Sequence, residues 1–331
     1  MPAAEVAVTA DLVRSLLRDQ HPDLADLPLE TVAHGWDNVV LRLGEDLAVR
    51  MPRRESSAGA LLAEQRWLPL LAPRLPLPVP APLRIGEPGP GYPWAWSVVP
   101  FLPGTPAADT PPADYRQAAV VVGGFFGALH TPAPADAPRN PFRGVSLERR
   151  AEAFAENRRI AAAEVADSAA VLQIWESALA AQFWDGPPMW LHGDAHPANI
   201  LVADGRVCAV VDFGDITAGD PATDLAVLWM LFPADCHHTF RRAYREAYVE
   251  TNRASADHAS ADQAPVNQAS VASDADHPLW TRARGWALHF ALVFLAHSAD
   301  NPQLRSVGRR TLAAVTATAS PDGGPGAVID P

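Results

Sequence analysis

The stretch Leu191-His192-Gly193-Asp194-Ala195-His196-Pro197-Ala198-Asn199-Ile200-Leu201 sets the interpretation of the whole chain. It places an aspartate five positions before an asparagine, between apolar ends that indicate one strand entering a loop and another leaving it. Thirteen residues after Asn199 lies Asp212, in Val210-Val211-Asp212-Phe213-Gly214. Two aspartates and an asparagine at these spacings, on hairpin-like strands, predict transfer of a phosphoryl group from a nucleotide.

Each of these side chains has an expected role in that chemistry. Asp194 is predicted to be the general base that accepts the proton of an attacking hydroxyl. Asn199 and Asp212 carry hard oxygen atoms, which suit a Mg²⁺ ion that keeps its other positions for phosphate and water. His192 and His196 are expected to support the loop rather than to do chemistry. The alternative for Asp194 is a turn aspartate that caps its own loop, and the two partner residues disfavour it.

The composition describes a globular protein of one large domain or two lobes, because 331 residues with 48% hydrophobic and 19% charged content can bury a sizeable core. A net charge of -12 argues against a nucleic-acid partner and is compatible with a cationic substrate. All 26 basic residues are arginine, and this bias also affects the interpretation of one candidate site residue, Arg50. Two cysteines are too few for a disulfide framework or a structural zinc site, and the N-terminus lacks the pattern of a signal peptide. The apolar run 286–296 is too short to cross a membrane, so a cytoplasmic location is expected.

The first 99 residues predict a small, sheet-rich lobe. Asp11 to Leu17 has helical spacing with Thr9 as N-cap, and residues 39–43 and 47–51 form an expected hairpin. A helix is predicted over 58–71, with further strands over 83–85 and 94–99. Residues 100–104, Pro-Phe-Leu-Pro-Gly, have the chemistry of a hinge.

Residues 105–331 predict a larger lobe in which helices predominate, interrupted by the motif strands between Met189 and Asp212. A low-complexity stretch over 251–276, rich in Ala, Ser, Asp and Gln, is expected to be a flexible insert, and the tail beyond Ser320 is expected to fray. The helices are predicted over 115–130, 147–164, 169–183, 221–232, 240–251 and 278–297.

With the follow-on Gly219-Asp220-Pro221-Ala222-Thr223-Asp224, these motifs resemble the aminoglycoside phosphotransferase family, the small-molecule branch of the protein-kinase-like fold. The resemblance spans about residues 30 to 315 outside the insert. It implies an α+β, two-lobed fold with nucleotide bound between a small N-terminal and a larger C-terminal lobe. It further implies that Asp220 and Asp224 brace the catalytic loop.

By the same resemblance, Ala48 and Arg50 stand where the kinase pattern has Ala-x-Lys. Ala48 would leave room for a purine, and Arg50 would reach the α- and β-phosphates, aimed by an ion pair with Glu64. Arginine replaces the usual lysine here, which the absence of lysine from the whole chain explains. Backbone near Val99 and Phe101 would contact the purine edge. The loop at residues 35–38 has no G-x-G-x-x-G pattern.

These features together predict an enzyme, a phosphotransferase with an alcohol group as acceptor that uses ATP or GTP and Mg²⁺. The resemblance implies an antibiotic as the acceptor, of the aminoglycoside type or another, and resistance as the result. A metabolic kinase of choline, homoserine or a sugar is the alternative, and a catalytically silent nucleotide-binding module is a third reading. The expected partner is a hydroxylated small molecule, with no nucleic acid or membrane, and the protein is expected to be a monomer or homodimer. Four acidic residues are candidate contacts for a cationic sugar: Asp215, Asp235, Glu246 and Glu250. Solvated helix faces explain the last three equally well.

Overall fold

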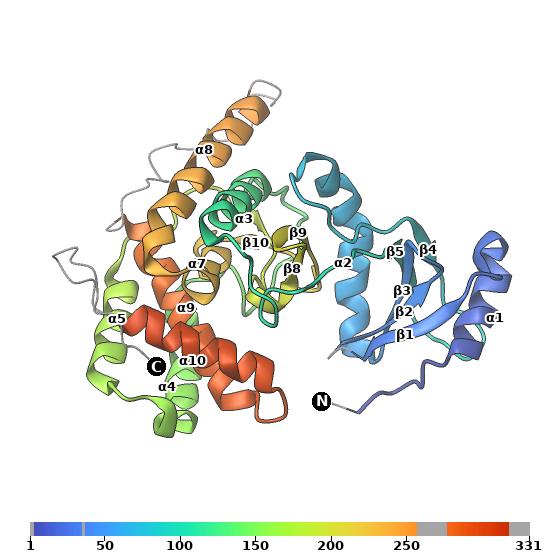
Figure 1. Cartoon of the computed structure of the whole chain (residues 1–331), viewed down its shortest axis with the longest axis horizontal. Coiled ribbons are helices and arrows are strands. Elements are labelled where there is room, and N and C mark those ends of the chain that lie inside the picture. The colour runs from blue at the N-terminus through green and yellow to red at the C-terminus, as the bar shows by residue number, and fades with distance from the viewer. Residues whose placement is uncertain (1–2, 35–36, 257–276, 318–331) are drawn as a thin grey trace.

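The computed structural model describes residues 3–34, 37–256 and 277–317, in which a small sheet region is followed by a larger helical region (Figure 1). The first half of the loop at residues 35–38, the segment 257–276 and the tail beyond Ser320 lie outside the described residues. The predicted mixture of helices and strands, with the strands concentrated in the N-terminal part, is confirmed.

The N-terminal region is built on a five-stranded antiparallel sheet in the order β1-β2-β3-β5-β4. The predicted hairpin forms, and its turn contains Gly44 with a φ of 64°, a left-handed conformation that glycine adopts readily. One strand, β1, was not predicted from the sequence. The strands are β1 (Leu29–His34), β2 (Asn38–Leu43), β3 (Leu47–Pro52), β4 (Arg84–Gly86) and β5 (Trp96–Pro100).

Alternation along the strands gives this sheet two different faces. Val49 and Met51 of β3 are fully buried in a cluster that includes Leu16 and Leu17 of helix α1 (Ala10–Gln20). Thr9 caps α1 by accepting a hydrogen bond from the backbone of Leu12 at 3.2 Å, as the sequence predicts. Ala48 and Arg50 fall on the opposite side of β3, where they are also buried. The sheet thus packs its apolar side on α1 and presents its polar side to the rest of the protein.

Helix α2 (Glu55–Leu71) connects the two regions. Its middle contacts the sheet, since the Gln65 amide donates to the backbone oxygen of Trp96 at 2.9 Å. Its C-terminal part belongs to the large core, where Trp67 lies 5.0 Å from Trp190 between ring centroids. The large core therefore draws on residues well before the hinge predicted at 100–104.

The C-terminal region differs from the predicted helices in four places. The expected helix over 221–232 is two short helices, and the one over 147–164 narrows to α4 with short 3-10 turns at either end. Helix α8 continues through Ala256, so the first six residues of the expected insert are helical, and α10 was not predicted. The helices are α3 (Tyr115–Leu129), α4 (Ala151–Ile160), α5 (Ser168–Ala180), α6 (Ala222–Leu225), α7 (Val227–Leu231), α8 (His237–Ala256), α9 (Pro278–His297) and α10 (Pro302–Thr316).

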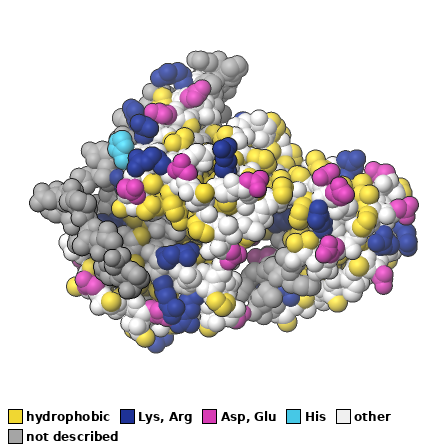
Figure 2. Space-filling model, in the orientation of Figure 1, with side chains coloured by type: hydrophobic (Ala, Val, Ile, Leu, Met, Phe, Trp, Pro, Cys, Tyr) yellow, Lys and Arg dark blue, Asp and Glu magenta, His cyan; other side chains and the backbone are white. Residues whose placement is uncertain are grey.

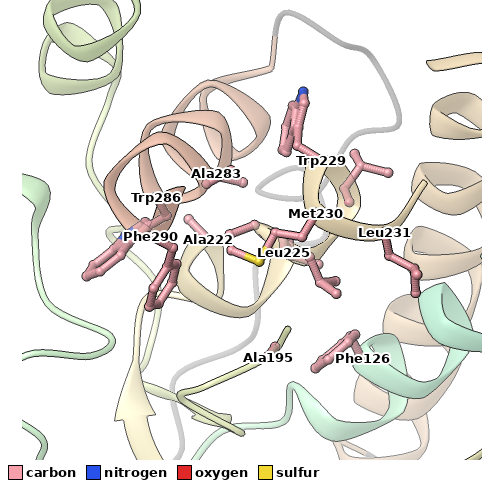
Figure 3. Packing of buried hydrophobic residues seen from close by; sticks show 14 of the residues in the cluster. Phe126, Ala195, Ala222, Leu225, Trp229, Met230, Leu231, Ala283, Trp286 and Phe290 are labelled. Carbon is pink, nitrogen blue, oxygen red and sulfur yellow. The ribbon is translucent and has the colours of Figure 1, made fainter. Parts of the chain in front are cut away.

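Helix α9 lies in the middle of the large hydrophobic core. Trp286 and Phe290 of α9 pack near Ala222 and Leu225 of α6 (Figure 3). Helices α3 and α8 approach closely on another side, because a Cβ atom on Gly127 would lie 2.5 Å from the backbone oxygen of Tyr244. Burial of this many apolar side chains fixes α6 and α9 rigidly behind the motif loops.

Short strands carry the motifs in this region. β7 (Met189–Leu191) pairs with β10 (Thr217–Gly219), and β8 (Ile200–Ala203) forms a hairpin with β9 (Arg206–Val210) that also pairs with β6 (Thr105–Pro106). The loop that contains Asp194 thus runs from β7 to β8, and Asp212 follows β9. These pairings bring the two aspartates to the same end of the region.

The visible face in Figure 2 intersperses arginine with acidic side chains over both regions. Its described residues form no continuous basic surface of the kind that nucleic acids bind. Among the described helices, none combines the length and the apolar character that a membrane span requires.

Candidate active site

The loop between β7 and β8 is anchored from below by Asp224 of α6. The fully buried Asp224 carboxylate accepts hydrogen bonds from the backbone N–H of His192 at 2.7 Å and of Gly193 at 2.9 Å. His130, at the end of α3, contacts the same carboxylate at 3.2 Å and the Tyr244 hydroxyl at 2.9 Å. Because α6 is held in the large core, these bonds fix the start of the loop.

Gly193 makes the sharp turn that follows. Its φ of 87° lies in the left-handed region, and a Cβ atom there would sit 2.2 Å from the backbone oxygen of Asp215. Only glycine fits this close approach. The turn directs the next side chain, Asp194, away from the core and toward the open side of the loop.

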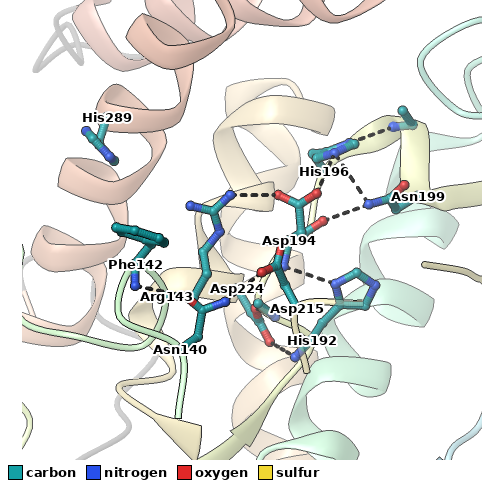
Figure 4. A network of polar contacts seen from close by, with 12 residues as sticks. Asn140, Phe142, Arg143, His192, Asp194, His196, Asn199, Asp215, Asp224 and His289 are labelled. Carbon is teal, nitrogen blue, oxygen red and sulfur yellow. Dashed lines mark hydrogen bonds and ion pairs between the residues drawn. The ribbon is translucent and has the colours of Figure 1, made fainter. Parts of the chain in front are cut away.

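Asp194 is held from several directions, as Figure 4 shows. His196 Nε2 lies 3.2 Å from its Oδ2, and Arg143 donates to its Oδ1 at 3.3 Å. The Asn199 amide donates to the Asp194 backbone oxygen at 2.9 Å. Burial alone would raise the pKa of Asp194, but the hydrogen bond from His196 and the guanidinium of Arg143 outweigh it and hold this pKa below its ordinary value. The carboxylate is therefore ionised, with 24% of the side chain exposed.

The hydrogen bonds fix which nitrogen of each loop histidine carries the proton. His192 Nδ1 accepts from the Asp194 N–H at 3.2 Å, so its proton lies on Nε2, which donates to the Val211 backbone oxygen at 2.9 Å. His196 Nδ1 accepts from the Ala198 N–H at 3.2 Å, so its Nε2–H points at Asp194. His196 thus lies between the loop backbone and the carboxylate, whereas His192 joins the loop backbone to that of Val211.

Asp212 has a different setting. Its φ is 63°, a conformation that is uncommon outside glycine and is frequent at functional sites. Its side chain is 58% exposed, and its nearest charged partner is Arg50, at 3.6 Å between Oδ1 and a guanidinium nitrogen. Arg50 comes from β3 of the sheet region, so this contact joins the two regions.

Arg50 also forms a buried ion pair with Glu64 of α2. Burial opposes the charge on Glu64, and the nearby Asp212 adds to this, so the pKa of Glu64 rises to about 7 in spite of Arg50. The Oε1 atom of Glu64 is buried without a hydrogen-bond partner. A Cβ atom on Gly214 would lie 3.4 Å from Asp212 Oδ1 and 3.9 Å from Glu64 Oε1, so the two carboxylates face the same small space.

This space and its oxygen atoms fit a Mg²⁺ ion with nucleotide phosphates. Asn199 uses its amide nitrogen on Asp194, which leaves Oδ1 as its acceptor, and Asp212 contributes an exposed carboxylate. One or two protein oxygens beside phosphate and water are the set that Mg²⁺ prefers. No cluster of three or more His, Cys, Asp or Glu side chains is found among the described residues, so these side chains alone do not enclose a metal.

The residues predicted to contact the purine lie next to one another in the sheet. Ala48 pairs with Val99 in the β3–β5 register, and Ala48 is buried at 3% exposure. The backbone N–H of Phe101 is already used, since it donates to the Asp46 oxygen at 2.7 Å. A purine that binds along this edge would find the carbonyl oxygen of Phe101 and not its N–H.

Asp220 and Asp224, which the resemblance treats as a pair, make different contacts. Asp224 holds the loop directly, whereas Asp220 pairs with Arg282 of α9 at 2.7 Å and accepts from the Ala222 N–H at 3.0 Å. Asp220 thus fastens the start of α6 to α9. Its effect on the loop passes through α6.

The sequence offered no signal for a further set of residues around Asp194. Arg143 lies 51 positions before Asp194 in a segment without periodicity, and Asn140 donates to Asp215 at 2.6 Å across 75 positions. Asp215 was considered only as a contact for a cationic sugar. Burial raises the pKa of Asp215, with the nearby Asp194 and Asp212 adding to it while Arg143 and Asn140 oppose it.

The chain is similar to known proteins in sequence and in fold. Residues 28–260 match the sequence model of the phosphotransferase enzyme family. No curated protein matches the chain.

Several solved structures share the fold. The GDP complex of wild-type aminoglycoside 2'-phosphotransferase-IIIa is 17% identical, with a TM-score of 0.60 over 94% of this chain and 99% of that one. Macrolide 2'-phosphotransferase MphH from Brachybacterium faecium is 24% identical, with a TM-score of 0.55 over 91% of this chain and 98% of that one. The gentamicin–APH(2")-IIa complex is 15% identical, with a TM-score of 0.52 over 95% and 97%. The predicted kinase-like fold is confirmed.

Proposed function

This chain belongs to the phosphotransferase enzyme family, and from that premise we propose that it transfers the γ-phosphoryl group of ATP or GTP to a hydroxyl of a small molecule, with Mg²⁺ bound. The observation that carries the proposal is the setting of Asp194. It is ionised, fixed by His196, Arg143 and the loop backbone, and still partly exposed, so a hydroxyl can reach it. A base placed this way orients the hydroxyl for in-line attack.

The nucleotide would lie between the two regions, against the polar side of the sheet. Arg50 would bind phosphate, Ala48, Val99 and Phe101 would border the purine, and Glu64 would hold Arg50 in place. Asn199 and Asp212 would hold Mg²⁺, which neutralises the phosphates when bound. In this scheme residues 1–99 are the nucleotide-binding lobe, 100–104 the hinge and 105–331 the catalytic and substrate-binding lobe.

The acceptor in this proposal is a hydroxylated antibiotic. Support comes from the shared fold, since the structures that match are named as aminoglycoside and macrolide phosphotransferases. A phosphate added to a hydroxyl would block target binding by charge and bulk, and resistance would follow. A cytoplasmic monomer or homodimer would have both the nucleotide and the incoming antibiotic at hand.

The test is a panel of hydroxylated antibiotics and metabolic alcohols, incubated with ATP or GTP and Mg²⁺ and analysed by mass spectrometry for a phosphorylated product. Product from at least one antibiotic, lost in Asp194→Asn, is the expected result. Asp235→Asn is the matched control, because Asp235 is exposed and its partner, Arg116, lies 3.7 Å away. Product confined to choline, homoserine or a sugar would replace the antibiotic by a metabolic acceptor. Nucleotide binding without any product would identify a silent module.

A further inference from the structure

A surface of arginines and aromatic rings lies beside Asp194, on the side away from His196 and Asn199 (Figure 4). Arg143 approaches the carboxylate from this side, with the ring of Phe142 and the imidazole of His289 beyond it. We call this the arginine surface; it consists of Phe142, Arg143 and Arg150, backed by the buried rings of His289 and Phe290.

The loop that bears Arg143 is pinned on both sides of this residue. Two hydrogen bonds hold Asn140 in place: its backbone N–H donates to the Thr217 hydroxyl at 2.9 Å, and its side-chain amide donates to Asp215 at 2.6 Å. Past Arg143, the Gly144 N–H donates to Thr223 at 3.1 Å. The guanidinium itself lies 4.8 Å from the centre of the Phe290 ring. Arg143 is therefore fixed in place before any acceptor arrives.

Arg150 is a partly buried cation without an acidic partner. Its Nε donates to His289 Nε2 at 3.4 Å, and its guanidinium lies 5.1 Å from the centre of the Phe142 ring. No carboxylate of the described residues pairs with it, and burial lowers the pKa of Arg150, with the like charge of Arg143 adding to that effect. A cation in such a setting favours an anion brought by a ligand.

His289 does not compensate the positive charge of Arg150. Burial lowers the pKa of His289 to about 3, and the charges of Arg150 and Arg143 contribute, so the ring is neutral. Because Nε2 accepts from Arg150, the proton lies on Nδ1, which is buried without a partner among the described residues. Arg143 Nε is likewise buried without a partner. Both of these nitrogens are buried, so it is the uncompensated charge of Arg150 that the arginine surface offers to a ligand.

The charges around Asp194 do not match a polycationic acceptor. Arg143 is balanced by Asp194, whereas Arg150 is balanced by nothing in the described residues. Of the four acidic residues considered as contacts for a cationic sugar, Asp215 accepts a hydrogen bond from Asn140, Asp235 pairs with Arg116 at 3.7 Å and Glu246 pairs with Arg242 at 3.9 Å. The fourth, Glu250, is exposed near the end of α8. A second ammonium or guanidinium brought close to Arg150 would be repelled.

We propose that the acceptor bears an acidic group, a carboxylate or a phosphate, near the hydroxyl that is phosphorylated, and that Arg150 with Arg143 binds this group. The inference rests on the proposed function, because it places the acceptor hydroxyl at Asp194. Arg150 is a specificity-determining residue in this arrangement. Phe142, with 55% of its surface exposed, would cover an apolar part of the same molecule.

Binding can be measured without knowledge of the natural acceptor, by a series of sugars with one ring and different charges. The probes are D-glucuronate, D-glucose and D-glucosamine, with glucose 6-phosphate to separate a phosphate from a carboxylate. Each is titrated by ligand-observed NMR into the full chain loaded with Mg²⁺ and a non-hydrolysable ATP analogue. We expect one of the two anions to bind at least about tenfold more tightly than glucosamine, the order of a charge-assisted hydrogen bond.

Variants then assign the preference to Arg150. Arg150→Gln is expected to remove the preference for the anion, and Arg150→Lys to restore a part of it because the positive charge returns. Arg116→Gln is the matched control, an exposed arginine on α3 that pairs with Asp235. The charge ranking in the unmodified protein needs no variant, so it stands even if Arg150→Gln unfolds.

Three results would overturn the inference. They are equal or tighter binding of glucosamine, no binding of any probe at millimolar concentration, and a preference that Arg150→Gln leaves unchanged. A loss of nucleotide affinity in Arg150→Gln, with the charge preference intact, would mean that Arg150 binds nucleotide phosphate. Hydrolysis of ATP that depends on Asp194, measured in separate samples of the same protein preparations, reports separately on the proposed function.

Discussion

The two aspartates of the motifs, Asp194 and Asp212, have the same side chain and opposite surroundings. Asp194 has 24% of its side chain exposed and is contacted by His196 and Arg143. The Asp212 side chain is 58% exposed, its φ is 63°, and its ion-pair partner among the described residues is Arg50, at 3.6 Å. The protein holds the first carboxylate in place by itself, whereas under the proposed function a bound Mg²⁺ would place the second.

This difference has a physical reason. A general base must lie at a fixed distance and angle from its hydroxyl. Hydrogen bonds that position the base before the acceptor binds therefore lower the activation free energy. A metal ligand can be placed by the metal, and Mg²⁺ brings its own octahedral geometry. The contrast therefore predicts that substitutions of Asp194 lower the rate of the chemical step, whereas substitutions of Asp212 lower the affinity for Mg²⁺ and nucleotide.

The largest effect is expected for Asp194→Asn. An amide cannot accept the proton of the acceptor hydroxyl, so kcat should fall by about 10²- to 10⁴-fold. Affinity for the Mg²⁺–nucleotide complex should stay within a few-fold of the unmodified protein, measured by calorimetry. A comparable loss of nucleotide affinity would contradict the separation of roles between the two aspartates.

Asp212→Asn should act on the metal. Removal of one negative oxygen is expected to weaken Mg²⁺-dependent nucleotide binding by roughly 10- to 100-fold. Titration of nucleotide at several Mg²⁺ concentrations measures this, and added Mg²⁺ should recover part of the activity. If binding and its Mg²⁺ dependence were unchanged, Asp212 would not be a metal ligand.

Asp224→Asn tests what holds Asp194 in place. The amide nitrogen would face one of the two backbone N–H groups that now donate to Asp224, at 2.7 and 2.9 Å, and leave a buried donor unpaired. We expect unfolding free energy to fall by about 1–3 kcal/mol in urea titrations, and kcat to fall with it. Asp235→Asn, at an exposed position, should change neither. Unaltered nucleotide affinity would show that only the Asp194 side is disturbed.

The last prediction concerns acid stability and the buried histidines. Burial lowers the pKa of His289 to about 3 and that of His237 to about 4, below the ordinary value of 6.5. The unfolded state then binds more protons below pH 6.5, so stability should fall as pH drops from 6.5 toward 4, by up to about 1.4 kcal/mol per pH unit for each histidine. Urea titrations from pH 7 to 4.5 measure the slope, and His289→Gln should reduce it. His238→Gln, at an exposed position of α8, is the control; an equal reduction there would refute the assignment.

The local motifs could be predicted because their signals are local. The strands around Asp194 and Asp212 follow from apolar runs that flank polar loops, and the β2–β3 hairpin follows from alternation around a glycine turn. Helix α10 has a local start signal in the sequence, an asparagine followed by a proline. Asn301 precedes Pro302 and caps the helix by accepting a hydrogen bond from the Leu304 N–H at 3.1 Å. The break between α6 and α7 at Ala226 has no such signal, because residues 225–232 are apolar throughout.

The surroundings of Asp194 could not be predicted in the same way. Arg143 reaches Asp194 through a loop whose position depends on pairing with β10 and on hydrogen bonds to Thr217 and Thr223. Such contacts join residues 51 to 79 positions apart and leave no periodic trace. Sequence patterns also do not indicate that α2 contributes side chains to two places, the sheet and the large core.

The absence of lysine, first met as a compositional bias, gives this site an unusual chemical profile. The three cations beside Asp194 and Asp212 are the guanidinium groups of Arg50, Arg143 and Arg150. None of them is a nucleophile under ordinary conditions. Nucleotide analogues that acylate an amine should therefore leave the site unlabelled, whereas dicarbonyl reagents that condense with guanidinium groups should react at the exposed part of Arg143. Covalent probes and inhibitors for this protein would need arginine chemistry.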